Sequence, residues 1–259
     1  KVRRDSNPNR QLAVTFTHLG KLNPICARDV NDLVDCFAVL AREASTCESP
    51  LILGLAESGI IPSFAMHQAC IAQGRRSHWF CTSRRNNGGF AFREPHSHAP
   101  QHYLPTGWLA APIDELWIVE DEITTGNTLI NLLSCIDLAR VAHHVHVFTI
   151  LDTRQDRVNG LPCFPSVSIQ SILKTTSDFW SDDLFVRARD VNSRSSRGKT
   201  HYVAGESISR SLPSLISGEL PSLQHVTISP WLVDGRHIFS RQQMTPGYYL
   251  YNVGDDGHA

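Results

Sequence analysis

The residues best suited to chemistry lie together in one short segment of the chain. Glu120 and Asp121 follow the apolar run at residues 116–119, and neighbouring carboxylates can accept hydrogen bonds from two neighbouring hydroxyl groups of a sugar. Residues 124–128 then supply threonine hydroxyls and backbone N–H groups, and Gly126 permits a tight turn into a following helix. Because a helix N-terminus favours a phosphate, this segment can hold a ribose by its diol and by its 5′-phosphate.

Segments with strand character alternate with segments of helical character, and this order predicts the frame that positions those residues. Continuous apolar runs are typical of strands buried on both faces of a parallel sheet, and strands are expected at residues 50–56, 78–83, 116–119 and 145–151. Apolar residues at helical spacing predict helices over residues 27–44, 62–74 and 129–142. The alternation indicates an α/β fold with a mostly parallel, twisted sheet flanked by helices.

Ligands of such sheets bind beyond the carboxyl ends of the strands, so the loops that follow the strands are expected to converge. Three of them, at residues 56–59, 83–102 and 120–128, should meet at one crevice. The stretch 84–112 shows no clear period, which predicts a functional or mobile loop without regular structure. Because the pattern weakens after Asp152, we divide the chain into a main domain at residues 1–183 and a C-terminal extension at residues 184–259.

Composition excludes several classes of protein. The 259 residues include 24 Lys and Arg against 25 Asp and Glu, so no general attraction to nucleic acid is expected. No apolar run approaches the roughly 20 residues of a membrane helix, and no secretory signal is visible at the start. The 7 cysteines include no C-x-x-C pair, which favours free thiols in a reducing cytoplasm.

Two levels of family resemblance rest on these residues. The segment 116–128 resembles the 5-phosphoribosyl-1-pyrophosphate (PRPP) signature of type I phosphoribosyltransferases: four hydrophobic residues, two acids, two variable residues, Thr-Thr-Gly and a later Ser or Thr. Further strings resemble the orotate phosphoribosyltransferase-like family found beside tellurite-resistance and stress-response genes, namely Asn9-Arg10 and residues 19–21, 54–58, 82–84 and 92–102. The similarity covers about residues 8–175. Members often carry a further domain named for a Thr-Arg-Ser-Pro signature, whose nearest string here is residues 193–196.

The resemblance implies a fold and a reaction. The fold is that of type I phosphoribosyltransferases, with an N-terminal hood and a small C-terminal extension. The reaction transfers 5-phosphoribosyl from PRPP to a base-like acceptor, or runs in reverse, with Mg²⁺ as cofactor and pyrophosphate displaced with inversion. The implied partners are small molecules, and proteins of this fold often form homodimers.

The resemblance also assigns site residues one by one. Glu120 and Asp121 match the catalytic acids that hold the ribose hydroxyls, and Asp121 is also the expected metal ligand. The 5′-phosphate loop matches Thr124, Thr125, Gly126, Asn127 and Thr128. The residues that match the pyrophosphate-binding positions are Ala56, Glu57, Ser58, Gly59, Arg84 and Arg85. The acid at Glu57 departs from a simple anion cradle and could bind a metal or a basic substrate instead.

The loop expected to close over the reacting centre contains Glu94 and His98 as catalytic candidates, with His96 and His102 as flexible-loop residues. A histidine there can donate a proton to the leaving oxygen near neutral pH. Two other interpretations stay open: exposed histidines without a role, and a zinc site formed by the three histidines.

Other functions also stay open at this point. One is a non-catalytic protein that senses PRPP or a nucleotide, and another is a metal-binding stress protein. Sensors usually lose groups of the hood and the pyrophosphate loop, so the presence of Arg84, Glu94, His96 and His98 favours the enzyme.

Overall fold

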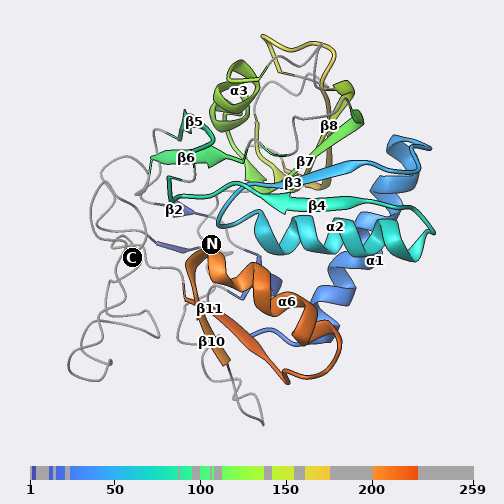
Figure 1. Ribbon diagram of the computed structural model, residues 1–259, viewed down its shortest axis with the longest axis vertical. Helices are drawn as coiled ribbons and strands as arrows, with labels where there is room; N and C mark the ends of the chain where they lie inside the picture. The colour runs from blue at the N-terminus through green and yellow to red at the C-terminus, as the bar shows by residue number, and fades with distance from the viewer. Residues whose placement is uncertain are drawn as a thin grey trace.

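The centre of the protein is a five-stranded parallel sheet (Figure 1). The computed structural model describes residues 2–3, 12–13, 16–20, 24–86, 88–94, 100–105, 107, 113–136, 142–154, 161–175 and 201–226. Every neighbouring pair of strands in this sheet is parallel. The strand order is β4 (His78–Cys81), β3 (Leu51–Gly54), β7 (Ile113–Ile123), β8 (Ala142–Asp152) and β9 (Ser168–Lys174).

Both faces of the sheet are buried, which explains the continuous apolar runs in its strands. Ile52, Trp117 and Phe148 join the core cluster that contains α1 (Ala27–Ala44) and α2 (Ile60–Ala72). Their neighbours along the same strands join a second cluster, which contains α3 (Asn127–Ser134). In Figure 1, α3 accordingly lies on one side of the sheet, and α1 and α2 lie on the other. The expected α/β fold, with a mostly parallel sheet flanked by helices, is confirmed.

The chain reverses its direction across the sheet between β3 and β7. From β3 it passes through α2 to β4 on one side, and it then returns to β7 on the other side of β3. A crevice opens beyond the carboxyl ends of the strands at such a reversal. The loop after β3 therefore lies beside the end of β7 and the turn that follows it, and several of the expected site residues come from these segments.

The stretch 84–112 is more regular than the sequence indicates. It contains β5 (Phe90–Arg93) and β6 (Gln101–Leu104), which pair antiparallel as a ribbon. The ribbon is fastened to α3, because Asn131 Nδ2 donates a hydrogen bond of 2.7 Å to the backbone oxygen of Arg93. The expectation of a stretch without regular structure is wrong for these two strands.

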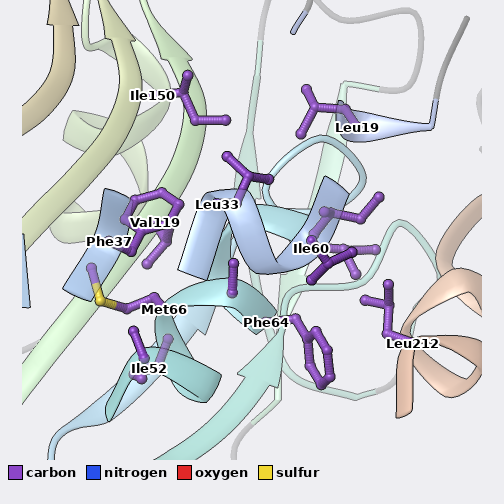
Figure 2. Close-up of a cluster of buried hydrophobic side chains, with 14 of the residues drawn as sticks. Leu19, Leu33, Phe37, Ile52, Ile60, Phe64, Met66, Val119, Ile150 and Leu212 are labelled. Atoms are coloured by element: carbon purple, nitrogen blue, oxygen red, sulfur yellow. The ribbon is translucent and has the colours of Figure 1, made fainter. Parts of the chain in front are cut away.

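The described part of the C-terminal region packs against the sheet domain. It comprises β10 (His201–Ala204), η5 (Gly205–Ser207), α6 (Ile208–Ile216) and β11 (Leu223–Val226). Leu212 of α6 is fully buried and lies in one cluster with Leu33 of α1 and Phe64 of α2, as Figure 2 shows. The expected boundary at residues 183 and 184 lies outside the described residues.

The N-terminal region is joined to this C-terminal segment through the backbone. Ile25 and Leu223 exchange hydrogen bonds of 2.7 and 2.8 Å, and His225 N donates to Gly20 O at 3.0 Å. The described elements before α1 are β1 (Val2–Arg3), β2 (Leu12–Ala13) and η1 (Thr17–Leu19). Residues 20–25 and 223–225 are thus joined by backbone hydrogen bonds.

One helix differs from its predicted range. The helix expected at residues 129–142 begins two residues earlier, at Asn127, and ends at Ser134. Ala142 already belongs to β8, where it pairs with Ile113 of β7. Among the described helices, none combines the length and the apolar character that crossing a membrane requires.

Candidate functional site

Glu120 and Asp121 lie where β7 extends beyond its neighbour β3. The pairing of β3 with β7 ends at Gly54 and Val119, whereas β7 continues beside β8 to Ile123. The two acids therefore have a strand on one side only, and both side chains are half-buried. The expectation that this strand ends at residue 119, with both acids in the following loop, is wrong, because β7 continues through them to Ile123.

The charges of the two carboxyl groups oppose each other. The pKa of Glu120 is held well above its usual range by burial, by the charge of Asp121 and by a hydrogen bond between the two side chains. Glu120 Oε1 also accepts a hydrogen bond of 2.9 Å from the backbone N–H of Asp121. Two close carboxylates in a sheltered position cannot both ionise readily, so the charged form of Glu120 is disfavoured.

The turn after β7 leads directly into α3. Gly126 has a φ of 78°, a left-handed conformation that glycine adopts without steric cost. The Thr125 hydroxyl accepts a hydrogen bond of 3.4 Å from the backbone N–H of Asn127. Because the first N–H groups of a helix have no acceptor within it, the start of α3 is suited to an anion. Thr125 and Asn127 are exposed, and Thr124 and Thr128 are half-buried.

The loop from Ala56 to Gly59 turns tightly between β3 and α2. Gly59 N donates to Leu55 O at 2.7 Å. A Cβ atom at Gly59 would lie 2.6 Å from Val119 O, so no larger residue fits without movement of the backbone. The peptide bond between Ala56 and Glu57 is cis. Glu57 is 7% exposed, which places a carboxyl group inside this loop.

Four side chains connect the ends of β4 and the β5–β6 ribbon to that loop. Arg84 Nη2 lies 2.6 Å from Glu94 Oε2, which also accepts a hydrogen bond of 2.9 Å from His102 Nε2. His102 Nδ1 lies 3.2 Å from Thr82 Oγ1, and Thr82 Oγ1 accepts the backbone N–H of Ala56 at 2.8 Å. The chain of contacts thus runs from an arginine to the backbone of the first loop.

The charges within this network follow from its burial. His102 is 1% exposed, and burial together with the Arg84 charge lowers its pKa to about 4. Burial alone would raise the pKa of Glu94, but the Arg84 guanidinium and His102 hold it below its usual range. At neutral pH Glu94 is therefore ionised and His102 is neutral, with the proton on Nε2 because a carboxylate only accepts.

Charged groups from the three segments affect one another's pKa values, as we expect for segments that line one crevice. The charge of Glu94 raises the pKa of Glu120, and the charge of Glu57 raises that of His102. His102 lies within strand β6 and not in an irregular loop. His96 and His98 lie outside the described residues, and so does any zinc site that includes them.

Sequence reasoning missed two sets of polar residues at this edge of the sheet. Arg154 binds Asp152 in a bidentate pair, with Nε and Nη2 at 2.9 and 2.8 Å from the two carboxylate oxygens. Glu206 of η5 accepts hydrogen bonds from the Ser83 hydroxyl and the Arg84 backbone. No local pattern signals either contact, although the position of Asp152 at the end of a predicted strand points to this edge.

A further group of possible metal ligands lies elsewhere among the described residues. His18, Asp29 and Asp32 have ligand atoms within 4.8 Å of one another, and His18 Nε2 lies 3.6 Å from Asp29 Oδ1. Asp29 already accepts a hydrogen bond of 2.7 Å from the backbone N–H of Cys26 at the start of α1. Asp29 therefore has a structural role at the N-terminus of that helix.

Comparisons with known proteins agree with this geometry at the level of the family. A family model described as "Phosphoribosyl transferase" matches residues 2–162. No curated protein matches the chain. Three solved structures illustrate its similarity to known folds. A hypothetical protein from Neisseria gonorrhoeae with bound ppGpp is 10% identical, with a TM-score of 0.41 over 66% of this chain and 93% of that one. Hypoxanthine phosphoribosyltransferase from Trypanosoma cruzi with IMP is 13% identical, with a TM-score of 0.37 over 59% and 75%. Orotate phosphoribosyltransferase from Aeropyrum pernix is 12% identical, with a TM-score of 0.37 over 66% and 82%.

Proposed function

Because this chain belongs to the phosphoribosyl transferase family, we propose that it transfers 5-phosphoribosyl from PRPP to a base-like acceptor and releases pyrophosphate, or catalyses the reverse reaction. One observation carries the proposal. The acid pair on β7 leads through a left-handed glycine turn into the start of α3, directly beside the tight loop after β3. That arrangement offers hydroxyl acceptors and two anion sites in one crevice.

The ribose and its 5′-phosphate are assigned to the segment after Val119. Glu120 and Asp121 accept hydrogen bonds from the two ribose hydroxyls, and these bonds are strongest when the carboxyl groups are ionised. The backbone N–H groups and hydroxyls of residues 124–128 surround the 5′-phosphate, where the helix dipole of α3 adds to the attraction.

Pyrophosphate is assigned to the loop from Ala56 to Gly59 and to Arg84 and Arg85. Planar guanidinium groups bind phosphate oxygens in pairs, and the Arg84 side chain is already held in place by Glu94. Burial of Glu57 in this loop brings a carboxyl group near the same anion. A cation between them is therefore favoured over direct contact.

Magnesium is the cation that fits these donors. Mg²⁺ prefers oxygen ligands and keeps several waters, and Asp121 is the residue assigned to hold it, with Glu57 as a second carboxyl group. When bound, the ion supplies positive charge for the leaving pyrophosphate.

The protein's own part in the reaction is to bind, orient and exclude water. The sugar gains oxocarbenium character as pyrophosphate departs, as in glycoside cleavage, and a preorganised polar site stabilises that change in charge. Glu94 stays ionised and His102 stays neutral near pH 7, so neither is prepared to donate a proton. If the leaving oxygen receives a proton from this loop, His98 is the residue to which we assign it.

The cellular setting is part of the proposal as well. All seven cysteines are free thiols in the structure, which supports a reducing cytoplasm. We place the enzyme there, as a possible homodimer that acts on small molecules and not on nucleic acid. A link to stress response and tellurite resistance rests on the sequence resemblance alone.

A second candidate is a protein that senses PRPP or a nucleotide without turnover. The buried Glu57 favours it, since a carboxyl group in the pyrophosphate loop opposes binding of the departing anion. The two candidates differ in whether pyrophosphate appears when PRPP and an acceptor are both present.

Pyrophosphate release from PRPP, measured across a panel of bases with and without Mg²⁺, tests the proposal. We expect release with at least one base, and loss of it in Asp121→Asn at unchanged thermal stability. Tight PRPP binding by calorimetry without release from any base would support the sensor. Equal PRPP affinity in the wild type and in Asp121→Asn would refute the site itself.

A further inference from the structure

The turn that carries Arg84 and Arg85 is held by a carboxylate from the C-terminal segment. Glu206 of η5 is 122 residues away from Arg84 in the chain. One of its carboxylate oxygens accepts a hydrogen bond of 2.8 Å from Ser83 Oγ, and the other accepts the backbone N–H of Arg84. Ser83 Oγ in turn accepts the backbone N–H of Arg85 at 3.0 Å. A single side chain therefore orders the backbone of both arginines.

The position of Glu206 is itself fixed by the core. The next turn of chain begins α6, whose residues Ile208, Leu212 and Leu215 are fully buried in the cluster that includes α1 and α2. Ser209 Oγ donates a hydrogen bond of 2.8 Å to the backbone oxygen of Glu206. Because α6 cannot move without disrupting this core, Glu206 reaches Ser83 and Arg84 from a rigid support.

The contacts continue from this turn into the first loop of the crevice. Arg84 binds Glu94, Glu94 binds His102, and His102 contacts Thr82, whose hydroxyl accepts the backbone N–H of Ala56. The hydrogen bonds of Glu206 are therefore the outer end of a network that reaches the loop assigned to pyrophosphate.

The charge of Glu206 indicates that this residue acts by ordering the turn and not by attracting the anion. A carboxylate beside two arginines reduces the positive potential that attracts an anion, so on electrostatic grounds alone it weakens binding of a diphosphate. A carboxylate is, however, a strong acceptor for a backbone N–H and a hydroxyl at once. The presence of Glu206 is explained if the gain from fixing the backbone of the two arginines outweighs the loss of positive electrostatic potential.

We propose that Glu206 is a positioning residue that holds the turn at residues 83–85, so that Arg84 and Arg85 face an anion bound at residues 56–59. Residues 201–226 are then part of the substrate-binding unit, although the family match ends at residue 162. The anion is taken from the proposed function, whereas the positioning contact does not depend on it.

Hydrogen exchange in the ligand-free, full-length protein tests the contact first. The variants are Glu206→Gln, which keeps the size of the side chain, and Glu206→Ala. Glu219→Gln is the matched control, because Glu219 is an exposed carboxylate of the same segment. We expect exchange of the Arg84 amide to rise roughly tenfold or more in Glu206→Ala, as a charge-assisted hydrogen bond is lost, and to stay unchanged in the control. An unchanged rate in both Glu206 variants, with both folded by circular dichroism, would overturn the proposal.

Steady-state kinetics and calorimetry with magnesium pyrophosphate test the consequence. For Glu206→Gln and Glu206→Ala we expect KM for PRPP and Kd for pyrophosphate to rise roughly tenfold, while kcat stays within about twofold. A fall in kcat at unchanged KM and Kd would overturn the positioning role. If the wild-type protein binds neither PRPP nor pyrophosphate, the proposed function is refuted, and the exchange rates alone still decide the positioning contact.

Discussion

The raised pKa of Glu120 should make PRPP binding depend on pH. Burial and the Asp121 charge raise the pKa of Glu120 well above its usual range, whereas an ionised carboxylate accepts the hydrogen bonds of a ribose diol more strongly than a protonated one does. Binding therefore favours loss of the proton from Glu120. We expect PRPP affinity to rise with pH by up to about tenfold per unit below the pKa of the pair, with close to one proton released for each PRPP bound.

The same shift predicts the sign of a stability change. A pKa raised on folding means that the folded protein holds the proton more tightly than the unfolded chain. The stability that this group contributes is fully present below its ordinary pKa of 4.5, and it is lost as the pH rises through the pKa of the folded protein. Each unit over which Glu120 stays protonated only in the folded state costs ~1.4 kcal/mol. Glu120→Gln avoids this cost, so it should be more stable than the wild type at neutral pH and equally stable near pH 4.5.

Calorimetry in buffers of different ionisation enthalpy counts the protons released, and urea unfolding across the same pH range measures stability. We expect Glu120→Gln to bind PRPP roughly tenfold or more weakly at neutral pH and to release no proton. Asp114→Asn is the control, since Asp114 is an exposed acid at the opposite end of β7. If wild-type affinity were independent of pH and of buffer, the pair would not hold a proton that PRPP must displace, and the reasoning would fail.

Three further perturbations test the fold around the site. Gly59→Ala should destabilise the protein by ~1–3 kcal/mol, because its Cβ would lie 2.6 Å from Val119 O; Gly107→Ala, which meets no atom within 4 Å, should not, and equal midpoints in urea would contradict this. Folding lowers the pKa of His102 from 6.5 to about 4. The stability that this group contributes is therefore fully present above pH 6.5, and it falls by ~3 kcal/mol as the pH is lowered from 6.5 to 4. His102→Gln should flatten that part of the curve of unfolding free energy against pH, and an unaltered curve would exclude a buried neutral histidine. Leu212→Ala should cost ~2–5 kcal/mol in urea unfolding, and a cost below ~1 kcal/mol would show that α6 is not part of the core.

The strands of the sheet are predictable from sequence because both of its faces are buried. The alternation along β7 sends Trp117 to the cluster of α1 and α2, and Ile118 to the cluster of α3. Two buried faces require apolar residues at every position, and this is why the strand appears as an unbroken run. The same run ends at Glu120, where β7 is no longer paired with β3, so the sequence also marks where the candidate site begins.

The β5–β6 ribbon is not predictable in the same way. Each of its strands has only four residues, and just one position of β5, Phe92, is buried. Its fixed place comes from contacts distant in sequence, such as that between Cys135 Sγ and Ala91 O at 3.5 Å. His102 looks like a loop histidine in sequence because nothing local reveals that Phe92 stacks on its ring at 4.7 Å. Glu206 shows the same limit, since its partners are more than a hundred residues away.

The acids at the crevice raise the question of how the site can accept a polyanion. Asp152 is neutralised by Arg154, whose guanidinium lowers the pKa of that carboxyl although burial alone would raise it. Glu94 is paired with Arg84 in the same manner, and the raised pKa of Glu120 disfavours its charged form. The negative charge of these three carboxyl groups is thus reduced before any ligand arrives, and Asp121 and Glu57 are the acids that we assign to a cation.

A divalent cation at Asp121 and Glu57 would balance negative charge at the crevice, so these acids need not repel the substrate. With Mg²⁺ at Asp121 and Glu57, as we propose, these carboxylates become a site for the cation that accompanies a diphosphate. Arg85, on the turn that also carries Arg84, is an exposed residue. If the crevice binds an anion as proposed, that binding depends on how firmly residues 83–85 are held, and so on the carboxylate of Glu206.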